Sequence, residues 1–197
     1  MTLRRLAKDA SGASAAEFGL VLPLLILLLF GIIDAGRFMW SINRAEKAAQ
    51  MGVRMAVLTD NLSTAVGANY ANTSCGGTVI QPGDTIPPSC FTNVSCNNMG
   101  CNPGGSVTGY GTKFNAIVGK MDAFMREIDA SKVTIEYSQS GLGYAGDPNG
   151  PDVAPIVTVR LSGLPFQPMM LLGLVNIGLP EIRTSLTFED GVGTQSN

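Results

Sequence analysis

The longest uninterrupted hydrophobic stretch lies near the N-terminus of the chain. Residues 18–33 read FGLVLPLLILLLFGII without a charge, and a helical pattern rich in Ala, Met and Arg continues to about Leu58. A helix rises about 1.5 Å per residue, so about 20 residues cross a hydrocarbon core of about 30 Å. The pattern therefore predicts one helix over residues 13–58, with a membrane span at about residues 18–37.

Two charged residues occupy the last turn of this predicted span. Asp34 and Arg37 are three positions apart, which places them on one face of a helix where they can pair. Arg37 can extend its guanidinium toward the interface, and Trp40 suits the headgroup region. We therefore interpret Asp34 and Arg37 as an ion pair at the membrane edge.

A cleaved secretory signal is the competing interpretation, because basic residues precede the apolar run. Two features disfavour it. A small-x-small cleavage site does not follow the run, and the helical pattern continues through SINRAEKAAQMGVRMAV. The pattern favours a retained anchor.

The next region, residues 59–111, is rich in Gly, Pro and Asn and contains all four cysteines. Their spacing is neither that of a C-x-x-C redox pair nor that of a paired C-x-x-C zinc site, so disulfides are the favoured interpretation. A metal site built from four thiolates and free thiols remain as alternatives, and the pairing of the disulfides stays open. The cysteines are Cys75, Cys90, Cys96 and Cys101.

Residues 112–197 predict an α+β head. The segment TKFNAIVGKMDAFMREID has apolar residues, Phe124 among them, at helical spacing, which indicates an amphipathic helix that needs a sheet to cover its apolar face. Residues 133–137, 156–161 and 182–188 alternate between apolar and polar side chains, as in strands of an antiparallel sheet. The expected fold is a long N-terminal helix followed by a small domain with about three antiparallel strands and a disulfide-stapled loop.

Two segments between these strands carry open alternatives. Residues 164–180 are more apolar than a loop but too short to span a bilayer, so core packing, membrane docking and partner binding all remain open. In GLGYAGDPNGPD, the oxygen-bearing residues Asp147, Asn149 and Asp152 are conceivable calcium ligands. Their spacing does not fit an EF-hand, and the composition suits a long turn, which is the favoured interpretation.

Composition narrows the function classes. Charged residues make up 14% of the chain with a net charge of -2 and no basic stripe, so nucleic-acid binding is not indicated. Histidine is absent from the sequence, which removes the commonest general base and metal ligand. A hydrolase would need paired carboxylates, and the acidic residues of the head are typical of solvated faces. We expect no catalysis, no cofactor and no metal.

A short motif precedes the apolar run: Gly12, then four intervening residues, then Glu17 and the aromatic Phe18. It resembles the type IVb prepilin processing motif, which implies that a prepilin peptidase removes a leader of residues 1–12 and that the mature chain begins at Ala13. A carboxylate at the edge of hydrocarbon is costly unless it is partnered. The new amino group of a neighbouring subunit can partner Glu17 and set the register of assembly; the alternative is that Glu17 simply lies among headgroups.

The N-terminal region as a whole, residues 3–57, resembles the TadE-like family of tight-adherence (Tad) pilus proteins. The resemblance rests on the basic start, the motif, the LVLPLL core, the turn from Asp34 to Arg37 and the Ala/Arg helix after it. It implies a minor pilin or pseudopilin whose partners are prepilin peptidase, other pilin and Tad subunits, and lipid of the bacterial inner membrane. The cysteines favour a periplasmic head and a cytoplasmic N-terminus, with incorporation into an extracellular pilus left open. A membrane-tethered periplasmic binding or adhesion protein is the alternative.

Overall fold

The computed structural model describes residues 12–126, 128–148, 151–169 and 177–188. The chain divides into two compact units. The first comprises the N-terminal part of the chain to Trp40 together with Pro165–Ile177, and the second comprises Ser41–Leu164 with the residues from Gly178 onward. The leader predicted at residues 1–12 lies outside the described residues except for Gly12, and the predicted domain boundaries stay predictions.

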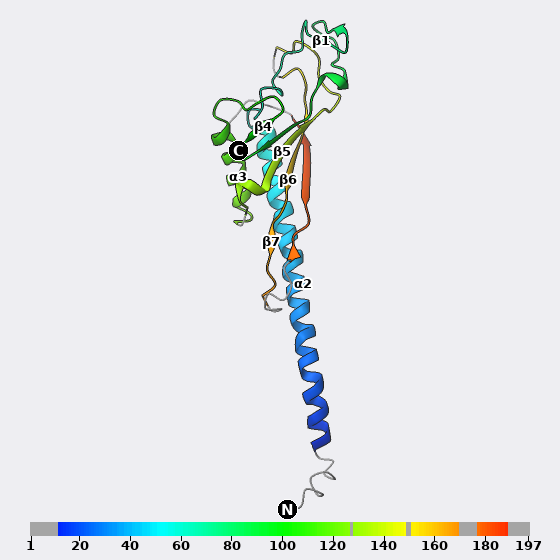
Figure 1. Cartoon of the computed structure of the whole chain (residues 1–197), viewed down its shortest axis with the longest axis vertical. Helices are drawn as coiled ribbons and strands as arrows, with labels where there is room; N and C mark the ends of the chain where they lie inside the picture. The colour runs from blue at the N-terminus through cyan, green and yellow to red at the C-terminus, as the bar shows by residue number, and fades with distance from the viewer. Residues whose placement is uncertain (1–11, 127, 149–150, 170–176, 189–197) are drawn as a thin grey trace, which may run out of the picture. The chain divides into compact units, whose positions relative to one another are not determined.

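A single helix, α2, runs from Ala13 to Leu58 (Figure 1). The long N-terminal helix predicted from the sequence is thus confirmed, and its two parts differ in burial. Side chains of the apolar run are exposed, whereas a stripe of mainly small residues in the second unit is buried at helical spacing. This stripe consists of Ala45, Ala48, Ala49, Gly52, Val53 and Ala56. Small side chains allow neighbouring elements to approach the helix closely.

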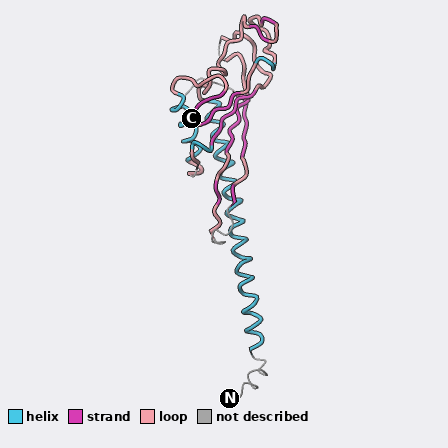
Figure 2. The backbone as a smooth tube through the Cα atoms, viewed as in Figure 1, coloured by secondary structure: helices cyan, strands magenta, loops and turns pink. Residues whose placement is uncertain are grey.

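The second unit contains a five-stranded antiparallel sheet (Figure 2). The α+β class is confirmed, but the expected number of about three strands was too low. The three strands predicted from alternation are present, and the cysteine-containing region adds two more at one side of them. In spatial order the strands are β4 (Gly100–Asn102), β3 (Val94–Asn97), β5 (Val133–Ser138), β6 (Ile156–Leu161) and β9 (Ile182–Thr187).

Alternation along the strands gives the sheet one buried and one polar face. Ile135 of β5 lies opposite Val159 of β6 and Cys96 of β3, and all three side chains are fully buried. On the other face, Arg160 pairs with Glu136 at 3.1 Å. The phenol of Tyr137, a buried residue of β5, accepts a hydrogen bond from the backbone nitrogen of Leu62. Burial raises the pKa of Tyr137. The core of the second unit therefore lies on the Ile135 face.

Helix α3, from Tyr110 to Asp122, packs against α2 within the second unit. A Cβ atom added at Gly52 would lie 2.6 Å from the sulfur of Met121, so the close contact between the two helices requires a residue without a side chain at position 52. The predicted helix was too long: it ends at Asp122, and the chain then turns, with the Phe124 carbonyl accepting a hydrogen bond from Arg44 Nε at 3.1 Å. The prediction that Phe124 lies on the buried face was therefore wrong, because this side chain is exposed beyond the helix end.

Short elements complete the described chain. Cys75 is bonded to Cys90 and Cys96 to Cys101, which confirms the prediction of disulfides and settles their pairing. Cys96 and Cys101 lie directly opposite each other on β3 and β4, so this bond fastens the edge strand β4 to its neighbour. The short elements are β1 (Ser74–Cys75), β2 (Thr78–Val79), η2 (Pro88–Cys90), η3 (Ala130–Lys132), β7 (Pro165–Phe166) and β8 (Ile177–Gly178).

Candidate functional site

The residues of the predicted processing motif lie at the start of α2. Gly12 is exposed and immediately precedes Ala13, the first residue of α2. An added Cβ at Gly12 would have no described atom within 4 Å, so the glycine is not required by packing. Glu17 and Phe18 follow one turn later and are exposed. The peptide bond between Gly12 and Ala13 is thus at the exposed end of a helix.

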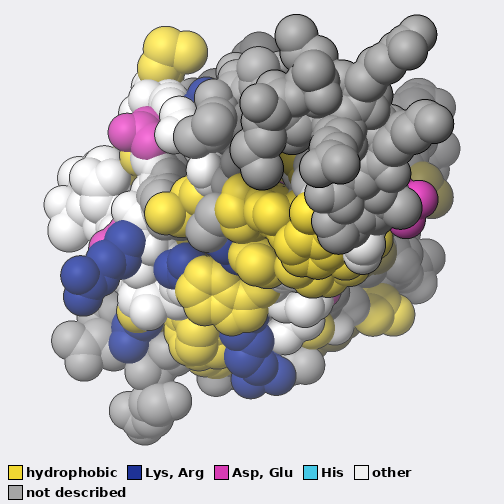
Figure 3. Space-filling model, turned by 90° about the horizontal axis from the view of Figure 1, so that it is seen from below, with side chains coloured by type: hydrophobic (Ala, Val, Ile, Leu, Met, Phe, Trp, Pro, Cys, Tyr) yellow, Lys and Arg dark blue, Asp and Glu magenta, His cyan; other side chains and the backbone are white. Residues whose placement is uncertain are grey.

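The following part of α2 presents an apolar surface on which large side chains are exposed. The helix is long and apolar enough to cross a membrane, and no residue of its most apolar window is buried. Figure 3 shows hydrophobic side chains gathered together in the view from below. One surface hollow of about 680 Å³ is lined by Val21, Leu24, Leu25, Leu27 and Leu28. Four of these recur at helical spacing, so the hollow lies along one face.

Asp34, at the end of this apolar surface, is buried with only 4% of its area exposed. Its Oδ1 atom accepts hydrogen bonds from Arg37 Nη1 at 3.3 Å and from the backbone nitrogen of Met169 at 3.1 Å. A buried carboxylate without partners costs several kcal/mol, and these two hydrogen bonds offset that cost. The structure brings Asp34 and Arg37 together on the helix; their role at a membrane edge stays a prediction.

Phe166 of β7 packs on the same turn of the helix. Its ring meets the Phe38 ring edge-on, with 5.1 Å between centroids and 76° between the planes. The guanidinium carbon of Arg37 lies 5.8 Å from the Phe166 centroid, within the range of a cation–π contact. Sequence reasoning missed both Phe166 and the Met169 nitrogen, although an aspartate directly after an apolar run is itself a signal that a partner is needed.

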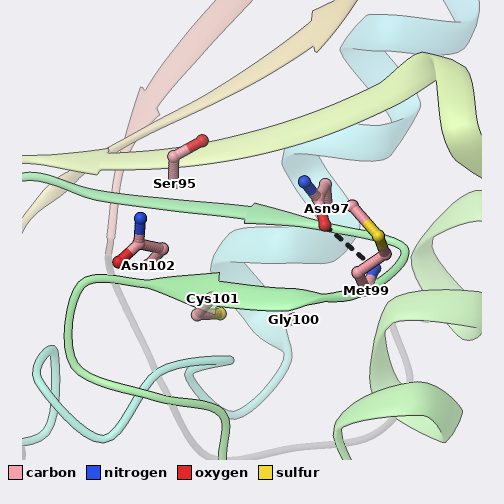
Figure 4. Close-up of a pocket in the computed structure, with 6 residues that line it drawn as sticks. All are labelled: Ser95, Asn97, Met99, Gly100, Cys101 and Asn102. Carbon is pink, nitrogen blue, oxygen red and sulfur yellow. Dashed lines mark hydrogen bonds between the residues drawn. The ribbon is translucent and has the colours of Figure 1, made fainter.

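Cys101, which forms a disulfide with Cys96, lines a surface pocket of about 430 Å³. Figure 4 shows the six residues that line this pocket. At its end, the backbone nitrogen of Met99 donates a hydrogen bond to Asn97 Oδ1 at 2.9 Å, and the Met99 side chain is almost fully exposed. The lining contains no acidic or basic side chain, so the pocket offers no group for acid–base chemistry. The lining residues are Ser95, Asn97, Met99, Gly100, Cys101 and Asn102.

The residues considered as calcium ligands have another explanation in the described part of the chain. Asp152 is buried, and its two carboxylate oxygens accept hydrogen bonds from the backbone nitrogens of Tyr70 and Asp147. Burial, and then the nearby Asp152 charge, raise the pKa of Tyr70. Asn149 lies outside the described residues. Among those described, no group of three or more acidic, Cys or His side chains is arranged to hold a metal ion.

Comparison with protein families identifies the segment that carries the motif and the apolar helix. Residues 12–54 match the family model described as TadE-like protein. The match begins at Gly12 and includes Glu17, the apolar surface and the pair of Asp34 and Arg37. Searches of curated proteins and of solved structures find no match.

The TadE-like match suggests involvement in Tad pilus assembly. Proteins of this family are structural and assembly components rather than enzymes, and the family implies other Tad pilus subunits as partners. Together with the apolar helix, it suggests a membrane-anchored protein. The match ends within α2, so it assigns no role to the sheet, α3 or the disulfides of the second unit.

Proposed function

We propose that this chain is a minor pilin or pseudopilin of a Tad-type pilus assembly system, with a structural role and no catalysed reaction. The observation that carries the proposal is the TadE-like match over residues 12–54, which begins at the motif glycine and covers the exposed apolar part of α2. In this proposal a prepilin peptidase cuts between Gly12 and Ala13, and the trimmed chain enters assembly.

Packing of α2 against other subunits is the proposed basis of assembly. Helices associate in lipid through van der Waals contact and polar groups, because lipid tails remove the hydrophobic driving force between them. The hollow around Leu24 supplies an apolar contact face, and the exposed Glu17 supplies a charge near its N-terminal end. The amino group created at Ala13 of a neighbour would neutralise Glu17 and fix the register.

The proposed topology has a cytoplasmic N-terminus, a span in the inner membrane and the second unit in the periplasm or on the pilus. Two observations support it. The apolar run has the length of one membrane crossing, and all four cysteines of the second unit are in disulfides, which persist in oxidising compartments.

Processing is tested by a matched pair of glycine substitutions, Gly12→Val and Gly19→Val. An added Cβ meets no described atom within 4 Å at either position, so both variants should fold alike. Intact-mass spectrometry should find the wild-type chain and Gly19→Val beginning at Ala13, and Gly12→Val still carrying Met1. A wild-type chain that keeps Met1 in cells with an active prepilin peptidase contradicts the proposal.

Assembly is tested by a second pair, Glu17→Ala and Glu46→Ala, which remove exposed carboxylates from the two parts of α2. Glu17→Ala should lose cross-linking to other pilus subunits and incorporation, while Glu46→Ala should keep both. If Glu17→Ala assembles like the wild type, packing through this charge is excluded, and a tethered periplasmic binding or adhesion protein becomes the better interpretation. Fractionation with and without the peptidase would separate the two further.

A further inference from the structure

The chain after β6 returns to α2 at the turn where the apolar run ends. Within the first unit, Met169 donates its backbone N–H to Asp34, and Phe166 packs on Phe38 and Arg37. Asp34 directly follows Ile33, the last residue of the uncharged run. The contact is therefore fixed to one level of the helix by a buried hydrogen bond and by ring packing.

The side chains next to this contact are apolar and exposed. Met169 exposes 63% of its area and Ile177 of β8 exposes 40%, whereas Asp34 and Phe166, which make the contact with the helix, are buried. Trp40 is also exposed, on the helix about 10.5 Å beyond Ile33 at 1.5 Å per residue. Exposed apolar side chains beside a buried polar contact are candidates for an interaction surface.

We propose that Met169 and Ile177 contact the lipid bilayer at the boundary between acyl chains and headgroups, and that the Asp34 carboxylate holds them there. The inference rests on the membrane-anchoring part of the proposed function and assigns a lipid partner to β7, β8 and Met169. Their role in the fold is then to widen the single-helix anchor at the outer end of its span.

Continuity with the membrane span is what favours lipid over other occupants. The apolar surface of α2 ends at Ile33, and Met169 is tied to the next residue, so the two apolar surfaces adjoin. Arg37 is partly exposed beside them and can reach lipid phosphates, and tryptophan is enriched at the headgroup level. Apolar, aromatic and cationic side chains within about two turns of a helix are typical of the bilayer interface.

The test is site-directed fluorescence in vesicles of phosphatidylethanolamine and phosphatidylglycerol. The native cysteines are all in disulfides, so a single introduced cysteine can be labelled with NBD in the oxidised full chain. The hydrogen bond to Asp34 comes from the backbone of residue 169, so Met169→Cys leaves its donor in place. Quenching is measured with iodide in water and with lipids carrying a nitroxide at a shallow or a deep position of the acyl chain.

Labels at Met169→Cys and Ile177→Cys should shift their emission to the blue and be quenched most by the shallow nitroxide. Leu24→Cys, 71% exposed in the apolar run, is the deep reference, and Met99→Cys, 87% exposed in the second unit, is the aqueous reference. If Leu24 is not quenched by lipid, the membrane anchor of the proposed function fails. If Leu24 is quenched but Met169 and Ile177 behave like Met99, only the lipid contact is overturned. Labels shielded from both iodide and lipid would indicate a protein partner and also overturn it.

The role of the carboxylate is tested by adding Asp34→Ala or Asp34→Asn to the Met169→Cys chain. Asparagine keeps an oxygen that can accept from the Met169 nitrogen, whereas alanine removes the acceptor. The alanine variant should lose most of the shallow quenching at residue 169, the asparagine variant should keep most of it, and Leu24 should be unchanged in both. Equal quenching in the alanine variant and the parent would show that Asp34 does not hold the contact.

Discussion

Asp152 is the side chain on which the arrangement of the loops in the second unit depends most directly. Its Oδ2 accepts from the Tyr70 nitrogen at 2.6 Å, and its Oδ1 accepts from the Asp147 nitrogen at 3.1 Å. The first donor is 82 positions away in the sequence and the second is five positions away. One buried carboxylate thus joins the segment before the first disulfide to the loop between β5 and β6.

The substitution Asp152→Asn keeps the shape of the side chain but replaces one acceptor oxygen by an NH₂ group. Only one of the two backbone N–H groups can then be satisfied, and the other faces a donor. A hydrogen bond to a charged group contributes about 1.5–3 kcal/mol, and a buried unsatisfied donor costs about 1–3 kcal/mol. We expect the free energy of unfolding to fall by about 2–3 kcal/mol.

The measurement is urea-induced unfolding of the oxidised full chain in mild detergent, followed by near-ultraviolet circular dichroism. Hydrogen exchange of the Tyr70 and Asp147 amides provides a local readout. Asp84→Asn is the matched control, because Asp84 is exposed and the asparagine oxygen can still accept the hydrogen bond that its side chain receives from the Gln81 nitrogen at 2.9 Å. The control should change stability by less than about 0.5 kcal/mol. Equal effects of the two substitutions, or unchanged exchange at both amides in Asp152→Asn, would refute the reasoning.

Three further predictions concern the second unit. Burial raises the pKa of Tyr110 from 10 to about 12, so the unfolded chain loses this proton first and the free energy of unfolding falls as the pH rises from 10 to about 12. In urea unfolding across this pH range, Tyr110→Phe should show a smaller fall in the free energy of unfolding than the wild type. Replacing Cys75 and Cys90 by Ser opens a loop of 15 positions and should lower the free energy of unfolding, measured by thermal unfolding, by about 3 kcal/mol. Removing the shorter bridge between β3 and β4 in the same way should lower it by about 2 kcal/mol. Met121→Ala should lower the free energy of unfolding by about 2–5 kcal/mol. Adding Gly52→Ala to this variant should restore about 1 kcal/mol, because alanine has the higher helix propensity and fills the space that Met121 leaves. A double variant no more stable than Met121→Ala alone would contradict the contact between Gly52 and Met121.

The parts of the fold that the sequence predicted are those encoded by local periodicity. The apolar run and the alanine-rich stretch after it define α2, and alternation defines β5, β6 and β9. Strands β3 and β4 were missed because VSCN and GCN are short and rich in residues that favour turns. They form because the edge of β5 that does not pair with β6 is free to pair with β3. In this position Val94 and Cys96 of β3 lie on the buried face of the sheet.

Only part of the contact around Asp34 could be predicted from the sequence, because the sequence pattern reports local partners and not distant ones. Asp34 and Arg37 are three positions apart on one helix, so their pairing follows from helix geometry alone. The other partner of Asp34 is a backbone N–H 135 positions away, and a backbone donor leaves no mark in the residue type. Phe166 carries a weak signal only, as an aromatic residue between two prolines in an apolar segment.

The position of β9 at the end of the element order sets an order of events during synthesis. The chain leaves the ribosome N-terminus first, so the alanine stripe of α2 is complete long before β9, which follows α2 by more than half of the chain. β9 pairs with β6 and adds Ile182 to the buried face next to Leu161. In the proposed topology, an exported chain thus passes through a stage in which α2 is already in the membrane while the sheet still lacks β9 as its edge strand.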